Sequence, residues 1–363
     1  MIKTFQVQKL NGKRDYKITF DERLNILTGK NGSGKTTLLK MLWYMISPNV
    51  ERLTEVDFKF AMVETDDFSV EVDNSDDVPK VSFSCPGKKP ITIDLRSARR
   101  FPKLMEPADV INQHIRELNT RSVFFPTFRR IEGGFSLDRR QPDELENRRS
   151  NMLQESLERI SRRIGVDNHL FVASISTDDI ENLFMRKFAE ASEQTTKLHV
   201  ELSKSIQEKI RLGGTSAKNA RQLINDIKKE VQAVDQKRES ILAPFNVLTK
   251  LADRVYKDKG IRFSSLWTLG NSAETFLPNQ LSAGEKQMLG FLCYNAFSEN
   301  TTIFIDEPEL SLHVDWQRSL FGYLLDQKSS NQFIVSTHSP FIYSKYPKNE
   351  IMLDEDKGDC EEE

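Results

Sequence analysis

The chain has 363 residues, a length that suits one large or two medium domains. Its 52 lysines and arginines nearly balance 54 aspartates and glutamates, so net charge indicates neither a nucleic-acid nor a membrane partner. Cys85, Cys293 and Cys360 show neither metal-ligand spacing nor a pairing pattern, which fits a reducing cytoplasm. No apolar run is long enough for a membrane span, and residues 1–5 read as a strand rather than a signal peptide. We therefore expect a cytoplasmic protein without a membrane partner.

The first chemical motif lies near the start of the chain. Residues 24–28 are an apolar run typical of a buried strand, and residues 37–43 read as a helix. Between them, residues 29–36 read Gly-Lys-Asn-Gly-Ser-Gly-Lys-Thr, which matches the phosphate-loop pattern of glycine, four residues and Gly-Lys-Thr. Such a loop directs backbone N–H groups and a helix N-terminus at phosphate oxygens. A chance glycine-rich turn is the alternative, and the flanking strand and helix argue against it.

Two residues of this loop have specific expected roles. Lys35 should reach the β- and γ-phosphates of ATP, and the Thr36 hydroxyl should ligate Mg²⁺. The candidate nucleotide-binding residues of the loop are Gly29, Asn31, Gly32, Ser33, Gly34, Lys35, Thr36 and Thr37.

Charge is distributed unevenly in the next part of the chain. Residues 51–80 are rich in acids. Residues 96–163 contain five arginine pairs, namely Arg99-Arg100, Arg129-Arg130, Arg139-Arg140, Arg148-Arg149 and Arg162-Arg163. Such pairs could contact DNA phosphates. A solvated, salt-bridged helix surface is the alternative, and the interleaved acids favour it slightly, so direct nucleic-acid binding stays an open question.

The middle of the chain has the apolar periodicity of helices. Mostly apolar residues recur at three- and four-residue steps from Ile180 to Ile210, and again from Ala220 to Val255. Glycines at 213–214 interrupt the pattern, which indicates two long helices joined by a turn as an antiparallel hairpin. Pro244 is expected to kink or break the second helix. Two helices packed onto a globular body are the alternative, but a single apolar stripe with charged flanks favours a projecting hairpin.

Residues 281–287 read Leu-Ser-Ala-Gly-Glu-Lys-Gln and begin another predicted helix. Ser282 can cap that helix, and Glu285 follows at the spacing of a capping box. Taken by itself, this segment is an ordinary helix start.

A third apolar run ends in two acids. Residues 302–305 read as a buried strand, and Asp306 and Glu307 follow it. Carboxylates at the C-terminal end of such a strand lie where open α/β sheets bind ligands. Asp306 is expected to hold Mg²⁺, and Glu307 to act as general base on the water that attacks the γ-phosphate. A strand that merely ends in solvated acids is the alternative.

A fourth apolar run, residues 333–337, also reads as a buried strand, and His338 follows it. A histidine at this point could donate a hydrogen bond to the γ-phosphate and sense its loss. A lone histidine at a strand end is more often a polar cap, but its spacing behind Glu307 favours the functional role. Glu307 and His338 are therefore the candidate catalytic residues.

In this order, the four motifs resemble those of ABC-type P-loop ATPases. In that family, the residues at the positions of Ser282 and Gly284 contact the γ-phosphate that is bound to the opposite protomer. The resemblance therefore implies a head-to-tail homodimer, or a higher oligomer, with two ATP molecules held between protomers.

The sequence after the paired acids separates the branches of this family. Transporter subunits usually continue with Pro-Thr-Ser-Ala-Leu-Asp, whereas residues 308–313 here read Pro-Glu-Leu-Ser-Leu-His. Together with Thr-His-Ser-Pro at 337–340 and the segment 124–130, this resembles the soluble branch of the family. That branch contains structural-maintenance-of-chromosomes proteins, recombination-mediator ATPases and overcoming-lysogenization-defect ATPases. It also contains ATPases of anti-phage defence systems such as PARIS, Septu and retrons.

The resemblance implies an α/β fold class, with an ABC-type P-loop ATPase head of mixed β-sheet core and an inserted antiparallel helical hairpin. The expected parts are the N-terminal part of the head at 1–175, the hairpin at 176–260, the C-terminal part of the head at 261–354 and an acidic tail at 355–363. Two features depart from the family. His313 stands where transporters have an aspartate, and neither Gln113 nor Gln141 convincingly matches the magnesium-sensing glutamine.

The leading functional hypothesis is a cytoplasmic ATPase that dimerises on ATP and regulates a partner effector in anti-phage defence. The partner is expected to be a co-encoded nuclease, since the chain has no nuclease signature of its own. The alternative is a DNA repair or recombination ATPase whose hairpin and arginine pairs bind DNA directly. A transporter subunit is disfavoured by the inserted hairpin and by residues 310–313.

Overall fold

The computed structural model divides the chain into two compact units, which we describe separately. It describes residues 1–75, 79–94, 107–127, 159–175, 177–212, 217–255, 262–263, 275–276 and 282–354. The first unit comprises Met1–Ser174, Ser298–Gly322 and Ser329–Glu363. The second comprises Ile175–Phe297 and Tyr323–Lys328. The domain boundaries expected from the sequence stay a prediction.

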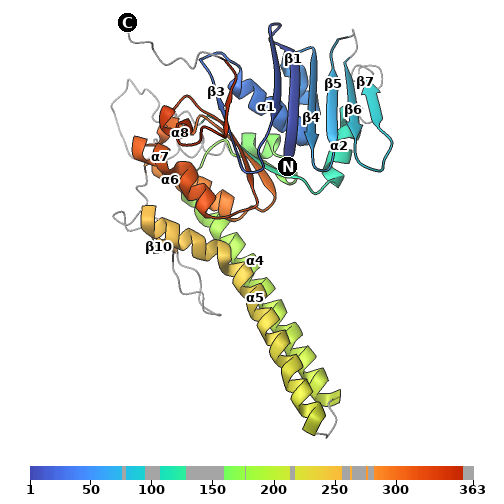
Figure 1. Ribbon diagram of the computed structural model, residues 1–363, viewed down its shortest axis with the longest axis vertical. Helices are drawn as coiled ribbons and strands as arrows, with labels where there is room; N and C mark the ends of the chain where they lie inside the picture. The colour runs from blue at the N-terminus through green and yellow to red at the C-terminus, as the bar shows by residue number, and fades with distance from the viewer. Residues whose placement is uncertain are drawn as a thin grey trace, which may run out of the picture. The chain divides into compact units, whose positions relative to one another are not determined.

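An antiparallel sheet of six strands belongs to the first unit. Its order is β2-β1-β4-β5-β6-β7 (Figure 1). The strands are β1 Ile2–Leu10, β2 Arg14–Thr19, β4 Phe60–Thr65, β5 Ser69–Asp73, β6 Lys80–Ser84 and β7 Ile91–Asp94. In β5, Val70 and Val72 are buried while Glu71 between them is exposed, so the strand presents one apolar face. The strand predicted at residues 1–5 is confirmed as part of β1.

A second sheet of six strands, also in the first unit, is parallel throughout. Its order is β14-β3-β13-β12-β8-β9. The strands are β3 Leu24–Thr28, β8 Arg121–Phe125, β9 His169–Phe171, β12 Thr301–Asp306, β13 Gln332–Ser336 and β14 Glu350–Met352. Every residue of β3, β12 and β13 is buried, as the continuous apolar runs predicted. Because the strands are parallel, their carboxyl ends lie at one edge of the sheet, where open α/β sheets bind ligands.

Helix α1 (Lys35–Ile46) joins the cores of the two sheets. It contacts β4 of the antiparallel sheet and β12 and β13 of the parallel one. Leu38 and Leu42 of α1 share one buried cluster with Phe5 and Phe304. The Trp43 ring also packs on Phe124, with 5.6 Å between the ring centroids. Burial on two sides fixes the position of the helix start, which follows the phosphate loop directly.

The second unit is built from helices. Its long helices are α4 (Thr177–Leu212) and α5 (Ala217–Val255), and both contact α6 (Ala283–Ala296). The unit also contains the two-stranded pair β10 (Arg262–Phe263) and β11 (Thr275–Phe276). Figure 1 shows α4 and α5 side by side along their length.

The contacts between α4 and α5 confirm the predicted antiparallel hairpin. Near the start of α4, the Phe184 ring meets the ring of Phe245 late in α5, at 5.6 Å between centroids. Near the end of α4, Lys209 pairs with Glu230 early in α5, at 2.5 Å. The contact partners thus run in opposite directions along the two helices.

A kink or a break was expected at Pro244. The helix is not broken there, because α5 continues through this residue, and Figure 1 shows α5 change direction towards its C-terminal end. Proline removes one N–H from the helix ladder. The side chains that follow, Phe245 and Leu248, are 2% and 1% exposed, and their burial holds the helix in place.

Several sequence predictions fall outside the described residues. They are the glycines at 213–214, Leu281, Gln141, residues 128–130, the tail at 355–363 and all arginine pairs except Arg162-Arg163. Within the described ranges, no helix combines the length and apolar character needed to cross a membrane.

Candidate nucleotide site

The phosphate loop connects the end of β3 to the start of α1. All three of its glycines have backbone angles that disfavour a side chain: φ is 147° at Gly29, 77° at Gly32 and 90° at Gly34, the residue that caps α1. A Cβ atom at Gly29 would also lie 3.0 Å from the Ser33 hydroxyl oxygen. The tight loop therefore needs glycine at these positions, and it leaves the N-terminus of α1 at the carboxyl edge of the parallel sheet.

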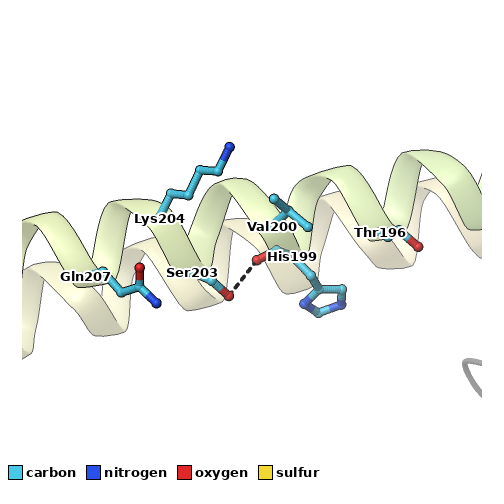
Figure 2. Close-up of a pocket in the computed structure, with 6 residues that line it drawn as sticks. All are labelled: Thr196, His199, Val200, Ser203, Lys204 and Gln207. Carbon is cyan, nitrogen blue, oxygen red and sulfur yellow. Dashed lines mark hydrogen bonds between the residues drawn. The ribbon is translucent and has the colours of Figure 1, made fainter.

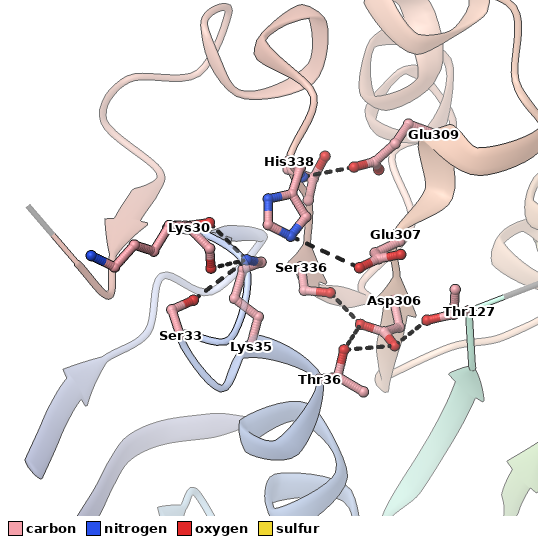
Figure 3. Close-up of polar contacts among 12 residues, drawn as sticks. Lys30, Ser33, Lys35, Thr36, Thr127, Asp306, Glu307, Glu309, Ser336 and His338 are labelled. Atoms are coloured by element: carbon pink, nitrogen blue, oxygen red, sulfur yellow. Dashed lines mark hydrogen bonds and ion pairs between the residues drawn. The ribbon is translucent and has the colours of Figure 1, made fainter. Parts of the chain in front are cut away.

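Lys35 is held by the loop that precedes it. Its Nζ donates to the carbonyl oxygens of Gly29 at 2.7 Å and Lys30 at 3.2 Å, and to the Ser33 hydroxyl at 3.4 Å (Figure 3). The residue is only 5% exposed. Burial lowers the pKa of Lys35, and three nearby carboxylates, led by Glu307, oppose the shift. The amine of Lys35 is thus held at the place where the motif requires a phosphate-binding group.

Asp306, at the end of β12, is surrounded by hydroxyl groups. Its carboxylate accepts hydrogen bonds from Thr36 at 2.9 and 3.1 Å, from Thr127 at 2.5 Å, and from Ser336. Figure 3 shows these side chains converging on the carboxylate from separate parts of the chain. Asp306 is 1% exposed, so its hydroxyl partners compensate for lost water.

The donor set at this point fits Mg²⁺. That ion prefers oxygen ligands and is usually held by one or two protein groups together with phosphate oxygens and waters. The Thr36 hydroxyl and the Asp306 carboxylate, the two residues predicted as ligands, lie within hydrogen-bond distance of each other.

Glu307 and His338 face each other beside this cluster. His338 Nε2 lies 3.9 Å from Glu307 Oε1 (Figure 3). Burial lowers the pKa of His338, and the charge of Lys35 lowers it further. The imidazole is therefore neutral near pH 7 and has one N–H to donate. The two candidate catalytic residues are brought together next to Lys35 and Asp306.

Sequence reasoning gave no role to two of these hydroxyl residues. Thr127 follows β8, and Ser336 is the last residue of β13. Both strands neighbour β12, so both side chains can reach Asp306. A hydroxyl residue at the end of an apolar run is the available signal, but its partner depends on the strand order.

Ser282 and Gly284 belong to the second unit, at the start of α6. The predicted capping box is confirmed: the Ser282 side chain accepts from Glu285 N at 3.3 Å, and Ser282 N donates to Glu285 Oε2 at 2.7 Å. Ser282 is exposed and Gly284 is buried. Their contact with a nucleotide on another protomer stays a prediction.

The other predicted positions add no ligand to the cluster. Asn31 and Gly32 are exposed in the loop, and Thr37 lies in the first turn of α1. Gln113 is exposed on α2 (Pro107–Glu117), so the magnesium-sensing glutamine stays unassigned. His313 is exposed beside Asp315, at 3.4 Å.

A pocket on α4, in the second unit, has a different character. It is lined by Thr196, His199, Val200, Ser203, Lys204 and Gln207, all on one helix (Figure 2). Ser203 donates its hydroxyl proton to the backbone oxygen of His199 at 2.9 Å. The lining contains neither a carboxylate nor a glycine-rich loop, so it does not have the parts of a nucleotide site.

The chain is similar to known proteins over most of its length. Residues 24–344 match the protein family described as "AAA domain, putative AbiEii toxin, Type IV TA system". The chain is also 24% identical over 371 residues to the "Retron Vc95 probable ATPase" of Vibrio cholerae serotype O1 biovar El Tor, covering 92% of this chain and 69% of that protein. The family match includes the phosphate loop, Asp306, Glu307 and His338.

The chain also matches two solved structures at low identity. One is an Smc head bound to the C-winged helix domain of ScpA, with a TM-score of 0.43, 11% identity, and coverage of 97% of this chain and 93% of that one. The other is an Smc head with an extended coiled coil, bound to the C-terminal domain of ScpA derived from Pyrococcus furiosus. Its TM-score is 0.39, its identity 10%, and the coverage 97% and 92%.

Proposed function

The chain belongs to the AAA-domain family of P-loop ATPases, and from that premise we propose that it binds ATP with Mg²⁺ around Lys35 and hydrolyses it. The observation that carries this proposal is the Asp306 carboxylate within 2.9 Å of the Thr36 hydroxyl, next to the buried Lys35 ammonium. These are the groups that phosphoryl transfer requires: a cation for the phosphates, oxygen ligands for Mg²⁺ and a base for water.

Each side chain has a distinct task in this proposal. Lys35 binds the β- and γ-phosphates, and Thr36 and Asp306 hold Mg²⁺, which neutralises phosphate charge when bound. Glu307 accepts a proton from the attacking water as a new bond forms to the γ-phosphorus and the bond to the ADP oxygen breaks. His338 donates its N–H to a γ-phosphate oxygen.

We further propose that ATP draws two copies together. The start of α6 supports this, because a helix N-terminus is an anion site and the Ser282 beside it is exposed. In the proposed dimer, Ser282 and Gly284 of one protomer contact the γ-phosphate held by Lys35 of the other. Hydrolysis then releases the contact, which makes the dimer a switch.

We propose that this switch regulates an effector, a co-encoded nuclease, in cytoplasmic anti-phage defence. The similarity to a retron-associated protein supports the defence setting. The alternative of a DNA repair ATPase rests on the hairpin and the arginine pairs. Of these pairs, Arg162-Arg163 alone falls within the described residues, where both side chains are exposed.

The first test is nucleotide binding. We expect Lys35→Ala to abolish most Mg·ATP binding, because it deletes the charge opposite the β- and γ-phosphates. Lys40→Ala is the matched control, since Lys40 is an exposed lysine on the same helix. Binding of ATP by Lys35→Ala with wild-type affinity would refute the site assignment.

A second test separates defence from repair. In the defence proposal, ATP turnover is slow and indifferent to duplex DNA, and protection of cells is lost in Lys35→Ala or when the co-encoded effector is deleted. Strong stimulation of the purified protein by DNA would instead favour repair. The comparison needs a salt series, because phosphate contacts weaken as salt rises.

A further inference from the structure

The segment that follows Glu307 is tied directly to the loop of His338. Residues Pro308–Ser311 form a short 3₁₀ helix, η4. Glu309 in η4 points its carboxylate at that loop, and Oε1 accepts the backbone N–H of His338 at 2.6 Å (Figure 3). The residue that is predicted to sense the γ-phosphate is thus held by a side chain two positions after the predicted base.

Gln317 makes a second link between the same two segments. It lies on α7 (Val314–Asp326), and its Nε2 donates to Leu312 O at 2.8 Å and Glu309 O at 3.3 Å. Its Oε1 accepts the Ser339 hydroxyl proton at 2.6 Å. One amide therefore fixes the end of η4 on one side and the residue after His338 on the other.

The charged form of the Glu309 carboxylate is disfavoured at this position by its removal from water. Burial raises the pKa of Glu309. The backbone N–H of His338 opposes that rise most, and the Thr337 hydroxyl and the Ser339 N–H oppose it further. Its second oxygen, Oε2, is buried and accepts no hydrogen bond from the part of the chain that the structure describes. A carboxylate with one buried oxygen that lacks a well-formed hydrogen bond is rare in a folded protein, so the position calls for a functional explanation.

We propose that Glu309 and Gln317 are positioning residues that fix His338 in relation to Glu307. This inference rests on the proposed ATPase function and names two further residues of the same site. The carboxylate sets the backbone of His338, and the amide sets Ser339. Together they hold the imidazole 3.9 Å from the Glu307 carboxylate. Neither residue touches ATP, and both act through the position of the histidine.

The consequence is a specific kinetic pattern. Loss of the Glu309 contact displaces His338, and a displacement of about 1 Å lowers the rate of a positioned reaction by up to ~100-fold. We therefore expect Glu309→Ala to lower kcat by about 10- to 100-fold. The KM for ATP should stay near the wild-type value, because the phosphate loop and Lys35 are unchanged.

The decisive experiment is a double-mutant cycle on the full chain, with Glu309→Ala, His338→Ala and the double variant. If Glu309 acts through His338, the double variant has the same kcat as His338→Ala alone. Glu309→Gln keeps an acceptor oxygen for the His338 N–H and should recover most of the lost kcat. Additive losses in the cycle, or a Glu309→Gln variant as slow as Glu309→Ala, overturn the inference.

Two controls separate position from stability. Gln332→Leu removes another buried amide of the first unit, which bonds the backbone of Ile2 and Asp21 at the other end of β13. It should lower the melting temperature without a matching fall in kcat. Gln317→Leu, run in the same cycle with His338→Ala, gives the answer if Glu309→Ala does not fold. If the wild-type chain shows no Lys35-dependent hydrolysis, the proposed function fails instead of this inference.

Discussion

Glu307 has a backbone conformation that non-glycine residues seldom adopt, with φ at 50°. Its N–H donates to Ser336 O at 3.0 Å, which holds the residue in this conformation. The turn of the backbone gives two adjacent acids different surroundings, since Asp306 meets three hydroxyls and Glu307 meets His338. Strain of this kind persists at functional sites when the surroundings fix it. Adjacent carboxylates can thereby take separate roles, one toward the metal and one toward water.

We expect Glu307→Gln to bind ATP normally but to hydrolyse it ~10²–10⁴-fold more slowly, because the amide keeps the size of the side chain and cannot accept a proton. Phosphate release and nucleotide binding, measured on the same preparation, check this. Glu299→Gln changes an exposed carboxylate and serves as control. Unchanged turnover in Glu307→Gln would mean that another group orients the water.

A buried histidine outside the site gives a pH prediction. The Ser122 hydroxyl accepts from Trp43 Nε1 at 3.0 Å and lies 2.8 Å from His169 Nδ1, so it can donate its proton to a neutral imidazole. Burial lowers the pKa of His169 from 6.5 to about 4. The unfolded chain therefore binds this proton more readily than the folded one. The contribution of His169 to the free energy of unfolding is complete above pH 6.5. It is lost as the pH drops toward 4, and the loss is about 3 kcal/mol in total.

Denaturant unfolding at a series of pH values tests this expectation. His169→Gln can still accept from Ser122 but does not titrate, so its stability should depend less steeply on pH between 6.5 and 4 than that of the wild type. The two chains share all other titrating groups, and the difference in slope isolates His169. Equal slopes would assign the acid sensitivity to other groups.

Among the elements, the hairpin owes its position to aromatic packing. The Phe245 ring of α5 contacts Phe184 of α4 and lies 4.9 Å from the Phe297 ring, between centroids, at the end of α6. We expect Phe245→Ala to lower the free energy of unfolding of the second unit by about 3–5 kcal/mol, because a buried ring leaves a cavity. Chemical denaturation followed by circular dichroism measures it. Ile224→Ala, on the same helix but at a side chain 63% exposed, should change little.

The sequence predicted best those features whose cause is local. The phosphate loop is one continuous segment, and β3, β12 and β13 each contain a run of mostly apolar residues, so each could be recognised from the sequence alone. The contacts of Thr127 and Ser336 with Asp306 depend on β8 and β13 flanking β12. No single sequence segment indicates this strand order. The hydrogen bond between Glu309 and His338 could not be predicted either. The Glu309 carboxylate accepts it from a backbone N–H, a donor that every residue except proline has.

Pro244 in the hairpin shows that a local sequence signal does not by itself decide whether a helix continues. A local rule predicted a kink or a break at Pro244. The helix bends (Figure 1) but continues, since the cost of one missing hydrogen bond is smaller than the gain from burying Phe245 and Leu248. Local signals thus predict where an element starts and what chemistry its end carries. Long-range packing decides whether it continues.

At the scale of the whole molecule, the proposed composite site predicts that two inactive variants restore activity when they are mixed. A site formed within one chain would not show this behaviour. Homodimers of Lys35→Ala lack the phosphate-binding lysine at both sites, and homodimers of Ser282→Arg lack the second anion contact at both. A mixed dimer has one site that joins an intact Lys35 to an intact Ser282, while its other site carries both changes. A shared site is therefore restored in mixed dimers, whereas sites completed within one chain are not.

We expect equal amounts of the two inactive variants to recover a part of wild-type turnover. If the chains pair at random this is roughly a quarter, since half of the dimers are then mixed and each has one of two sites intact. Phosphate release, measured across a series of mixing ratios, should peak at equal amounts. Mixing Lys35→Ala with Lys35→Ala/Ser282→Arg is the control, because no dimer in that mixture retains an intact Lys35. Turnover that stays at the level of the separate variants would mean that Ser282 completes the site of its own chain, and the ATP-dependent dimer would lose its chemical basis.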